Sequence, residues 1–194
     1  MRQAFDNPAR HMEIGITHRD DARLRQIAAA GLVVGAVLGM AGAFAPSASL
    51  RGLAWGIDGT ALVVACALLT VHHFRRGNDL AAAGFLVFVA GETLLLSTAA
   101  MSPEAGAPFF GTGAGLWAAA LVLVGVSNIM PRLIAGVGLL GALLFAIVAL
   151  RTFQGEPLTP LSEPLPAFAY PFLAATLLGW AWVHYRDSAA KRLL

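Results

Sequence analysis

Long apolar runs alternate with short polar breaks along the chain. The runs cover residues near 27–45, 53–73, 80–100, 110–128, 133–151 and 167–185. Each run approaches the roughly 20 residues that an α-helix needs to cross the hydrocarbon core of a bilayer. The pattern therefore predicts an all-α, polytopic membrane protein with six transmembrane helices.

The breaks between the runs contain residues that end helices. Pro46 follows the first run, Arg75–Asn78 separates the second run from the third, and Pro131 follows the fourth. The longest break, residues 151–166, contains four prolines. Each proline lacks the backbone N–H that a helix interior needs, so this segment is predicted to be a loop.

The composition agrees with a lipid environment. The chain has 194 residues, of which 58% are hydrophobic and 12% are charged, whereas soluble domains carry about 25% charged residues. Cys66 is the only cysteine, so an intrachain disulfide is excluded. The basic residues lie at the ends of the runs and form no single patch. We therefore expect the lipid bilayer as the main partner, together with a second copy of the chain or another membrane protein, and no nucleic acid.

The basic residues also predict the orientation. Of the 13 lysines and arginines, 11 fall on one side of the predicted membrane, and only Arg51 and Arg151 fall on the other. The positive-inside rule then places both termini in the cytoplasm. We predict cytoplasmic tails at residues 1–25 and 187–194 around a transmembrane domain at 26–186, in a bacterial cytoplasmic (inner) membrane.

Similar sequences open the odd-numbered runs. Ala28–Val34 resembles Ala81–Val87, and a shorter match follows at Ala135–Val137. Each odd run leads toward a proline, and each even run is followed by arginine. This pattern predicts three pseudo-repeated helical hairpins that enter the membrane from the same side. The alternative is that helices rich in alanine and glycine resemble one another by composition alone.

Glycines recur every four residues in the first run. Gly31, Gly35 and Gly39 place a row of small residues on one helix face, which lets a second helix backbone approach closely in lipid. The row serves either packing within the chain or contact between two copies. We favour packing within the chain.

Two acidic residues lie inside predicted spans. Glu92 lies roughly 14 Å from the outer end of its span, at about 1.5 Å per residue, and Asp58 lies closer to that end. A charged acid at the centre of a membrane helix costs roughly 2.5–3.5 kcal/mol, and no lysine or arginine lies inside a span to compensate it. We therefore expect Glu92 to be a neutral acid whose partner comes from another helix.

The role of Glu92 stays open at this point. A protonated carboxyl can act as a structural link to another helix, through Thr60, Thr93, Trp117 or Tyr170. Alternatively, Glu92 and Asp58 form a site for a proton, a cation or another ligand. Helical spacing places Ala81, Phe85, Phe88, Leu96 and Ala99 on the face of Glu92 and no second polar group, which leaves Asp58 and Trp117 as the favoured partners.

Three histidines end spans on the cytoplasmic side. His72 and His73 are adjacent, so their side chains point about 100° apart on a helix and chelate one ion poorly. With His184 they are weak candidates for a metal or haem site, and contact with lipid phosphates is the favoured interpretation. We therefore expect no cofactor.

Three functions fit the sequence, and no motif assigns the chain to a family. The chain lacks the nucleophile-elbow, zinc-protease and phosphate-loop motifs, so an enzymatic role is disfavoured. A non-enzymatic accessory, assembly or stress-related membrane protein is the first interpretation. A small carrier or proton-linked binding protein that uses Glu92 and Asp58 is the second, and a membrane enzyme or cofactor-binding protein is the third. A charged cavity that reaches Glu92 would favour the second interpretation, and a dry, packed Glu92 would favour the first. Convergence of the three histidines within metal-bonding distance would favour the third.

Overall fold

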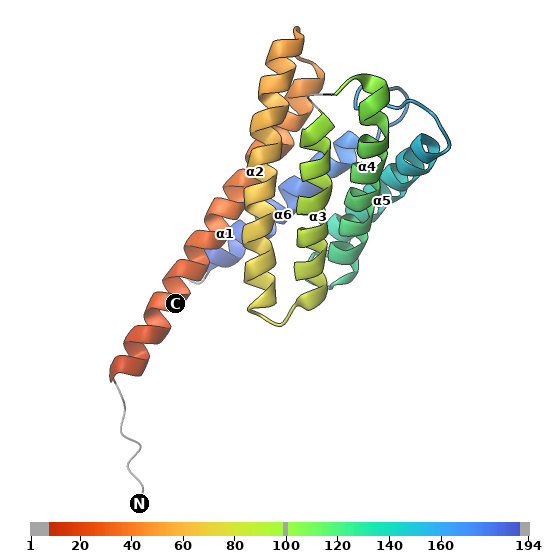
Figure 1. Cartoon of the computed structure of the whole chain (residues 1–194). Helices are drawn as coiled ribbons and strands as arrows, with labels where there is room; N and C mark the ends of the chain where they lie inside the picture. Colours follow the sequence, from red (N-terminus) through yellow and green to blue (C-terminus); the bar gives the residue numbers. More distant parts are fainter. Residues whose placement is uncertain (1–7, 99–100, 191–194) are drawn as a thin grey trace, which may run out of the picture.

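Six α-helices form the fold (Figure 1). The computed structural model describes residues 8–98 and 101–190, and these two ranges contain no β-strand. The helices are α1 (Pro8–Ala43), α2 (Ala48–Phe74), α3 (Asp79–Ser97), α4 (Pro103–Val126), α5 (Arg132–Phe153) and α6 (Tyr170–Ala190). The all-α prediction is confirmed.

Local chemistry explains where several helices begin and end. The hydroxyls of Ser47 and Ser102 accept hydrogen bonds from backbone N–H groups in the first turns of α2 and α4, each at 3.3 Å. The turns after α2 and α4 contain Gly77 and Asn128 with φ angles of 70° and 59°. This left-handed conformation is open mainly to glycine and asparagine, which is why these residue types stand there.

Five of the helices are long and apolar enough to cross a membrane: the part of α1 from Asp20 to Ala43, α2, α3, α5, and α4 from Glu104. Within the described residues, α6 is not among them. The predicted sixth span began at residue 167, but the helix begins only at Tyr170 and carries Arg186 near its end. Its apolar helical part is therefore shorter than the sequence pattern predicted.

The first helix is also longer than predicted. It begins at Pro8, inside the segment 1–25 that we predicted to be a tail. Residues 16–26 contain no proline or glycine that would end a helix, so the helix continues out of the apolar run. At the other end, α6 extends into the predicted tail 187–194 as far as Ala190, and residues 191–194 lie outside the described part.

The helices are arranged as a ring. Each of α1 to α5 packs against the next helix along the chain, and α6 crosses behind α3 and α4 to reach α1 (Figure 1). The α1–α2, α3–α4 and α5–α6 connections lie at one end of the bundle, which we call the distal end (Figure 1). The α2–α3 and α4–α5 turns and the start of α1 lie at the opposite, terminal end (Figure 1).

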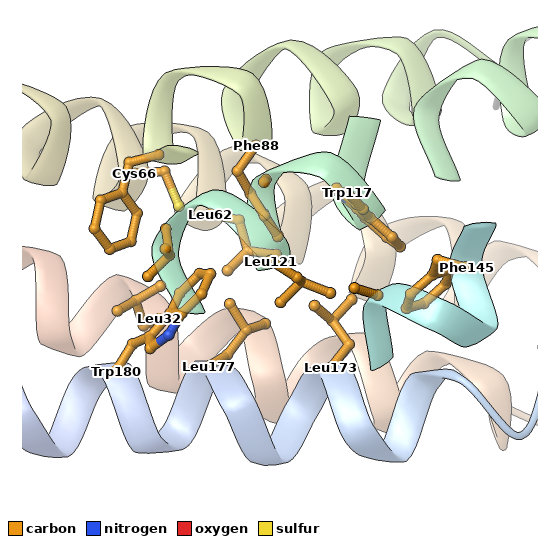
Figure 2. Close-up of a cluster of buried hydrophobic side chains, with 14 of the residues drawn as sticks. Leu32, Leu62, Cys66, Phe88, Trp117, Leu121, Phe145, Leu173, Leu177 and Trp180 are labelled. Carbon is orange, nitrogen blue, oxygen red and sulfur yellow. The ribbon is translucent and has the colours of Figure 1, made fainter. Parts of the chain in front are cut away.

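The centre of the ring is filled by side chains from all six helices. Figure 2 shows part of this core, with labelled residues from each helix: Leu32, Leu62, Cys66, Phe88, Trp117, Leu121, Phe145, Leu173, Leu177 and Trp180. Many equally apolar side chains point outward, and Leu53 and Leu143 are 61% and 58% exposed. Several polar side chains are buried instead, including Arg25, Glu92 and Thr176.

The glycine row of α1 packs against α2. A Cβ atom on Gly31 would lie 2.9 Å from the carbonyl oxygen of Ala61, and one on Gly39 would lie 2.9 Å from Oδ2 of Asp58. Gly35 lies between these two and meets the side chain of Leu62. The row therefore brings α1 and α2 of the same chain into close contact, as the favoured interpretation expected.

Candidate functional site

A cavity of about 530 Å³ extends from the distal end of the bundle to Glu92. Residues of α1, α2, α3, α4 and α6 and the loop segment 158–161 line it. Its outer part includes Arg51 and Trp55, and its inner part includes Asp58, Glu92 and Trp117. The cavity thus joins the two acids that the sequence singled out.

Glu92 lies at the inner end of this cavity and is only 4% exposed. It shares a buried face of α3 with Ala81, Phe85 and Phe88, as helical spacing predicted. Leu96, on the same predicted face, lines the cavity, and Ala99 lies outside the described residues. Its Oε1 atom lies against α2 at Gly59, where a Cβ atom would come within 2.7 Å of that oxygen. Its Oε2 atom has no hydrogen-bond partner in the described part of the protein. Glu92 is therefore positioned by its close packing against Gly59, while its Oε2 atom forms no hydrogen bond to the described residues.

Asp58 lies on α2 next to Gly59 and faces α1. Its carboxyl rests on Gly39 and Gly35, because a Cβ atom on these glycines would lie 2.9 Å and 3.2 Å from the Asp58 oxygens. Its Oδ1 atom is buried and has no hydrogen-bond partner among the described residues. Asp58 also interacts electrostatically with Glu92. The two carboxyls therefore line the same cavity, each packed against a glycine of a neighbouring helix.

Trp117 and Tyr170 complete the surroundings of the acids. The Trp117 indole interacts with Glu92, although its N–H forms no well-oriented hydrogen bond to any described residue. Tyr170 lines the cavity together with both acids, and its ring centre lies 6.1 Å from that of Trp117. Asp58 and Trp117, which the sequence favoured as partners of Glu92, thus line the cavity together with it. The two threonine candidates do not bond it, as each hydroxyl donates to its own helix.

Two further residues form the distal part of the cavity. The Trp55 indole N–H donates a hydrogen bond of 3.1 Å to the carbonyl of Gly39. The Arg51 guanidinium lies 6.0 Å from the centre of the Trp55 ring and donates to the carbonyl of Ala45 at 3.3 Å. The sequence pattern placed Arg51 outside the membrane and assigned neither residue to a binding site. Their spacing from Asp58 places all three on one face of α2, and that periodicity was the signal available in the sequence.

Aromatic rings close the inner end of the cavity. Phe88 stacks on Trp117 with ring centres 5.7 Å apart, and Trp180 packs edge-on against Phe85 at 5.0 Å. Phe85 also stacks on His73 at 5.4 Å. We call Phe85, Phe88, Trp117 and Trp180 the aromatic floor. It lies between the acid-lined cavity and a group of polar residues at the terminal end.

The three predicted histidines meet below this floor. His73 and His184 face each other with their Nε2 atoms 3.0 Å apart. His184 Nδ1 lies 2.7 Å from the carbonyl of Trp180, so this nitrogen carries the proton and Nε2 of His184 accepts from His73. His72 Nδ1 lies 2.7 Å from Asp21, which also accepts from Arg76 at 2.8 Å. These contacts link α1, α2 and α6.

The position of the histidines corrects one expectation. All three are at most 5% exposed, so the predicted contact with lipid phosphates is wrong. Asp21 of α1, Phe85 of α3 and His184 of α6 surround His72 and His73, which the sequence spacing did not reveal. No three histidine, cysteine, aspartate or glutamate side chains in the described ranges are placed to hold a metal ion together. The cluster instead forms a hydrogen-bonded closure of the terminal end.

Comparison with known proteins identifies no relative. No protein-family model matches the chain, and no curated protein or solved structure shows significant similarity to it. The functional argument therefore rests on the geometry of the cavity and on the chemistry of its residues.

Proposed function

We propose that the protein is an integral membrane protein whose six helices cross the bilayer, with both termini in the cytoplasm, and that it is a small carrier or binding protein. Its ligand enters the distal cavity and binds at Asp58 and Glu92 in exchange for protons. A bacterial cytoplasmic membrane is the proposed location.

The distribution of polar and apolar side chains supports the membrane assignment. Five helices have the length and composition of membrane spans. Large apolar side chains such as Leu53, Leu86 and Leu143 are more than half exposed, whereas Glu92 and Arg25 are buried. In water this surface would expose extensive apolar patches, whereas in a membrane the same side chains contact the hydrocarbon chains of the lipids.

The arrangement of the helices supports the proposed topology. The start of α1 lies at the same end as the α2–α3 and α4–α5 turns (Figure 1). These segments carry most of the basic residues, including Arg75, Arg76 and Arg132, whereas the distal segments carry Arg51 and Arg151. The α1–α2 and α3–α4 pairs each form an antiparallel hairpin, which also supports the proposal of repeated hairpins (Figure 1).

The cavity is the observation that carries the proposed binding function. A purely structural glutamate would close a hydrogen bond to a neighbouring helix. Here one oxygen each of Asp58 and Glu92 is buried without a partner in the described part, although both residues line an open cavity. A buried polar atom without a partner costs roughly 1–3 kcal/mol, so a ligand or proton that satisfies it binds with that advantage. The accessory-protein interpretation predicts a dry, packed Glu92 and receives no support from this cavity.

The proton enters the argument through the positions of the acids. Two neighbouring carboxyls in a low-dielectric site repel each other when both are ionised, so the empty site favours bound protons. The aromatic floor and the histidine cluster close the route toward the terminal end. We therefore propose that a carrier in this conformation would be open on the distal side. Transport to the other side would require the Asp21–His72 and His73–His184 contacts to separate.

Cysteine labelling tests this proposal. Leu96 lines the cavity one helical turn beyond Glu92, whereas Leu86 on the same helix is 57% exposed on the outer surface. In a Cys66→Ala background, we expect a small charged thiol reagent added outside intact cells to label Leu96→Cys. The matched Leu86→Cys should stay unlabelled because lipid covers it. Labelling of Leu86→Cys would contradict the membrane assignment, and protection of Leu96→Cys would contradict the open cavity.

A further inference from the structure

We propose that the ligand of the distal cavity is a small monovalent organic cation with an apolar body, bound between the carboxyls of Asp58 and Glu92 and the surrounding aromatic rings. This inference rests on the proposed function, because it names the ligand class of the same site.

The charges that line the cavity favour a single positive charge on the ligand. Asp58 and Glu92 are the acids of the lining, and Arg51 is its one cationic residue among the described residues. Arg51 lies at the distal part, where its guanidinium bonds the carbonyl of Ala45 and faces Trp55. When one of the two acids gives up its proton, its carboxylate carries a single negative charge, which one monovalent cation neutralises. An anion would instead meet two unpartnered carboxyls at the inner end.

The remaining lining disfavours a bare metal ion. Calcium takes six to eight oxygen ligands, and magnesium gives up its water reluctantly. Beyond the two carboxyls, the inner lining consists mainly of rings and aliphatic side chains, among them Phe110, Trp117 and Tyr170. Such walls do not replace the hydration shell of a small divalent ion. They do accommodate an ammonium group whose substituents are apolar.

The aromatic rings add a specific attraction for such a cation. An ammonium group within about 6 Å of a ring face is stabilised by roughly 0.5–2 kcal/mol, with tryptophan the best partner. Trp55, Phe110, Trp117 and Tyr170 all line this cavity. Its volume of about 530 Å³ lies in the range of roughly 300–1,000 Å³ that is typical of small-molecule sites, and it exceeds the needs of a single inorganic ion.

Binding would exchange a proton for the cation. The empty site holds protons on the acids, and the entering cation takes the place of one proton, which leaves through the distal opening to water. One positive charge enters and one leaves, so the site keeps its charge. The titratable or charged groups near the exchange are Asp58, Glu92, Tyr170, Cys66 and the more distal Arg51. Among the described residues, α1 and α4 contribute Gly39 and Trp117 to the lining and no ionisable side chain.

A pair of matched probes tests the ligand class on the unaltered protein. Benzyltrimethylammonium and neopentylbenzene have the same shape, but only the first carries a charge. We expect titration calorimetry of the full chain in lipid nanodiscs to show saturable binding of benzyltrimethylammonium and at least about tenfold weaker binding of neopentylbenzene. The affinity for benzyltrimethylammonium should rise with pH, by up to about tenfold per pH unit if one proton is exchanged. Repeating the titration in buffers of different ionisation enthalpy should show release of that proton.

Variants locate the site. Glu92→Gln should weaken benzyltrimethylammonium binding by at least about 100-fold and abolish proton release, because an amide cannot ionise. Trp117→Leu should weaken it by about 2- to 30-fold, the range expected for one cation–π contact. Glu104→Gln is the matched control, because Glu104 is exposed and lies outside the cavity lining, and it should leave binding unchanged.

Three results would overturn the inference, and a fourth would overturn the proposed function on which it rests. Equal affinity for the charged and neutral probes would show that the cavity recognises shape alone. Unchanged cation binding by Glu92→Gln would place the cation elsewhere. If Leu96→Cys is labelled from outside but benzyltrimethylammonium does not bind, the open cavity stands and the proposed ligand class is wrong. If the thiol reagent does not label Leu96→Cys, the open cavity is contradicted, and the proposed function is then wrong whatever the ligand.

Discussion

Gly59 makes the position of Glu92 possible, and replacing it offers a graded test of the site. A Cβ atom at Gly59 would lie 2.7 Å from Oε1 of Glu92, and 2.5 Å and 2.7 Å from the Cδ2 and Cγ atoms of Leu96. These separations are shorter than any real Cβ contact. Gly59→Ala must therefore push Glu92 and Leu96 away from α2 or separate α2 from α3.

The change in stability caused by Gly59→Ala follows from two opposing effects. Alanine stabilises a helix interior by roughly 0.5–1 kcal/mol relative to glycine, whereas an extra methyl group in a packed interior costs roughly 1–3 kcal/mol. Gly136→Ala is the matched control, because Gly136 is an exposed position in α5 with no atom within 4 Å of a Cβ. The control should show only the gain in helix stability from alanine. Gly59→Ala should therefore be about 1–3 kcal/mol less stable than Gly136→Ala.

Thermal unfolding in detergent measures this difference. At about 2–4 °C per kcal/mol for a chain of this size, the Tm of Gly59→Ala should lie several degrees below that of Gly136→Ala. Cation binding should also weaken in Gly59→Ala and not in Gly136→Ala. Equal Tm values and equal affinities for the two variants would refute the contact between Glu92 and the Gly59 surface, and with it the described position of the acid.

Three other perturbations test separate parts of the account. Gly35→Leu should lower the Tm, because the new side chain meets Leu62 on α2, and an unchanged Tm would show that this face is not packed. Reporter fusions or thiol labelling at residue 104 and in the loop 151–166 should read as external, and an internal signal at either site would contradict the topology. Asp21→Asn should weaken the links to His72 and Arg76 and make the terminal end easier to open. Faster amide hydrogen exchange at that end of α1 is the expected result, and unchanged exchange would argue against a closure there.

Much of the fold follows from periodicity. Apolar runs of membrane length predicted the helices, and proline, glycine and asparagine predicted most of the breaks. Glycine spacing predicted that the first helix packs closely within the chain, and the structure identifies α2 as its partner. The ends of the helices were less well predicted. α1 continues to Pro8 because nothing in the polar segment stops a helix, and the hydropathy pattern does not report the end of a polar helix.

The candidate site was predicted only in part. Burial of an acid in an apolar run is costly, so Glu92 and Asp58 stood out in the sequence. The cavity did not, because its shape depends on where α6 crosses the bundle and on the loop that carries Leu158–Leu161. The histidine cluster was missed for the same reason. His73 and His184 are far apart in the chain, and only the packing of α1 against both α2 and α6 brings their Nε2 atoms to 3.0 Å.

The central claim is that Glu92 is an acid that exchanges its proton with water through the distal cavity. Infrared difference spectroscopy of the protein in lipid tests it directly, with Glu92→Gln to identify the band and Glu104→Gln as the control. We expect a protonated-carboxyl band at about pH 7 that Glu92→Gln removes, that shifts rapidly in D₂O, and that disappears reversibly when the pH is raised or benzyltrimethylammonium is added. A band that does not respond to D₂O, pH or the cation would show a sealed structural acid and contradict the account. A carboxylate band that persists well below pH 7 would contradict the neutral resting state.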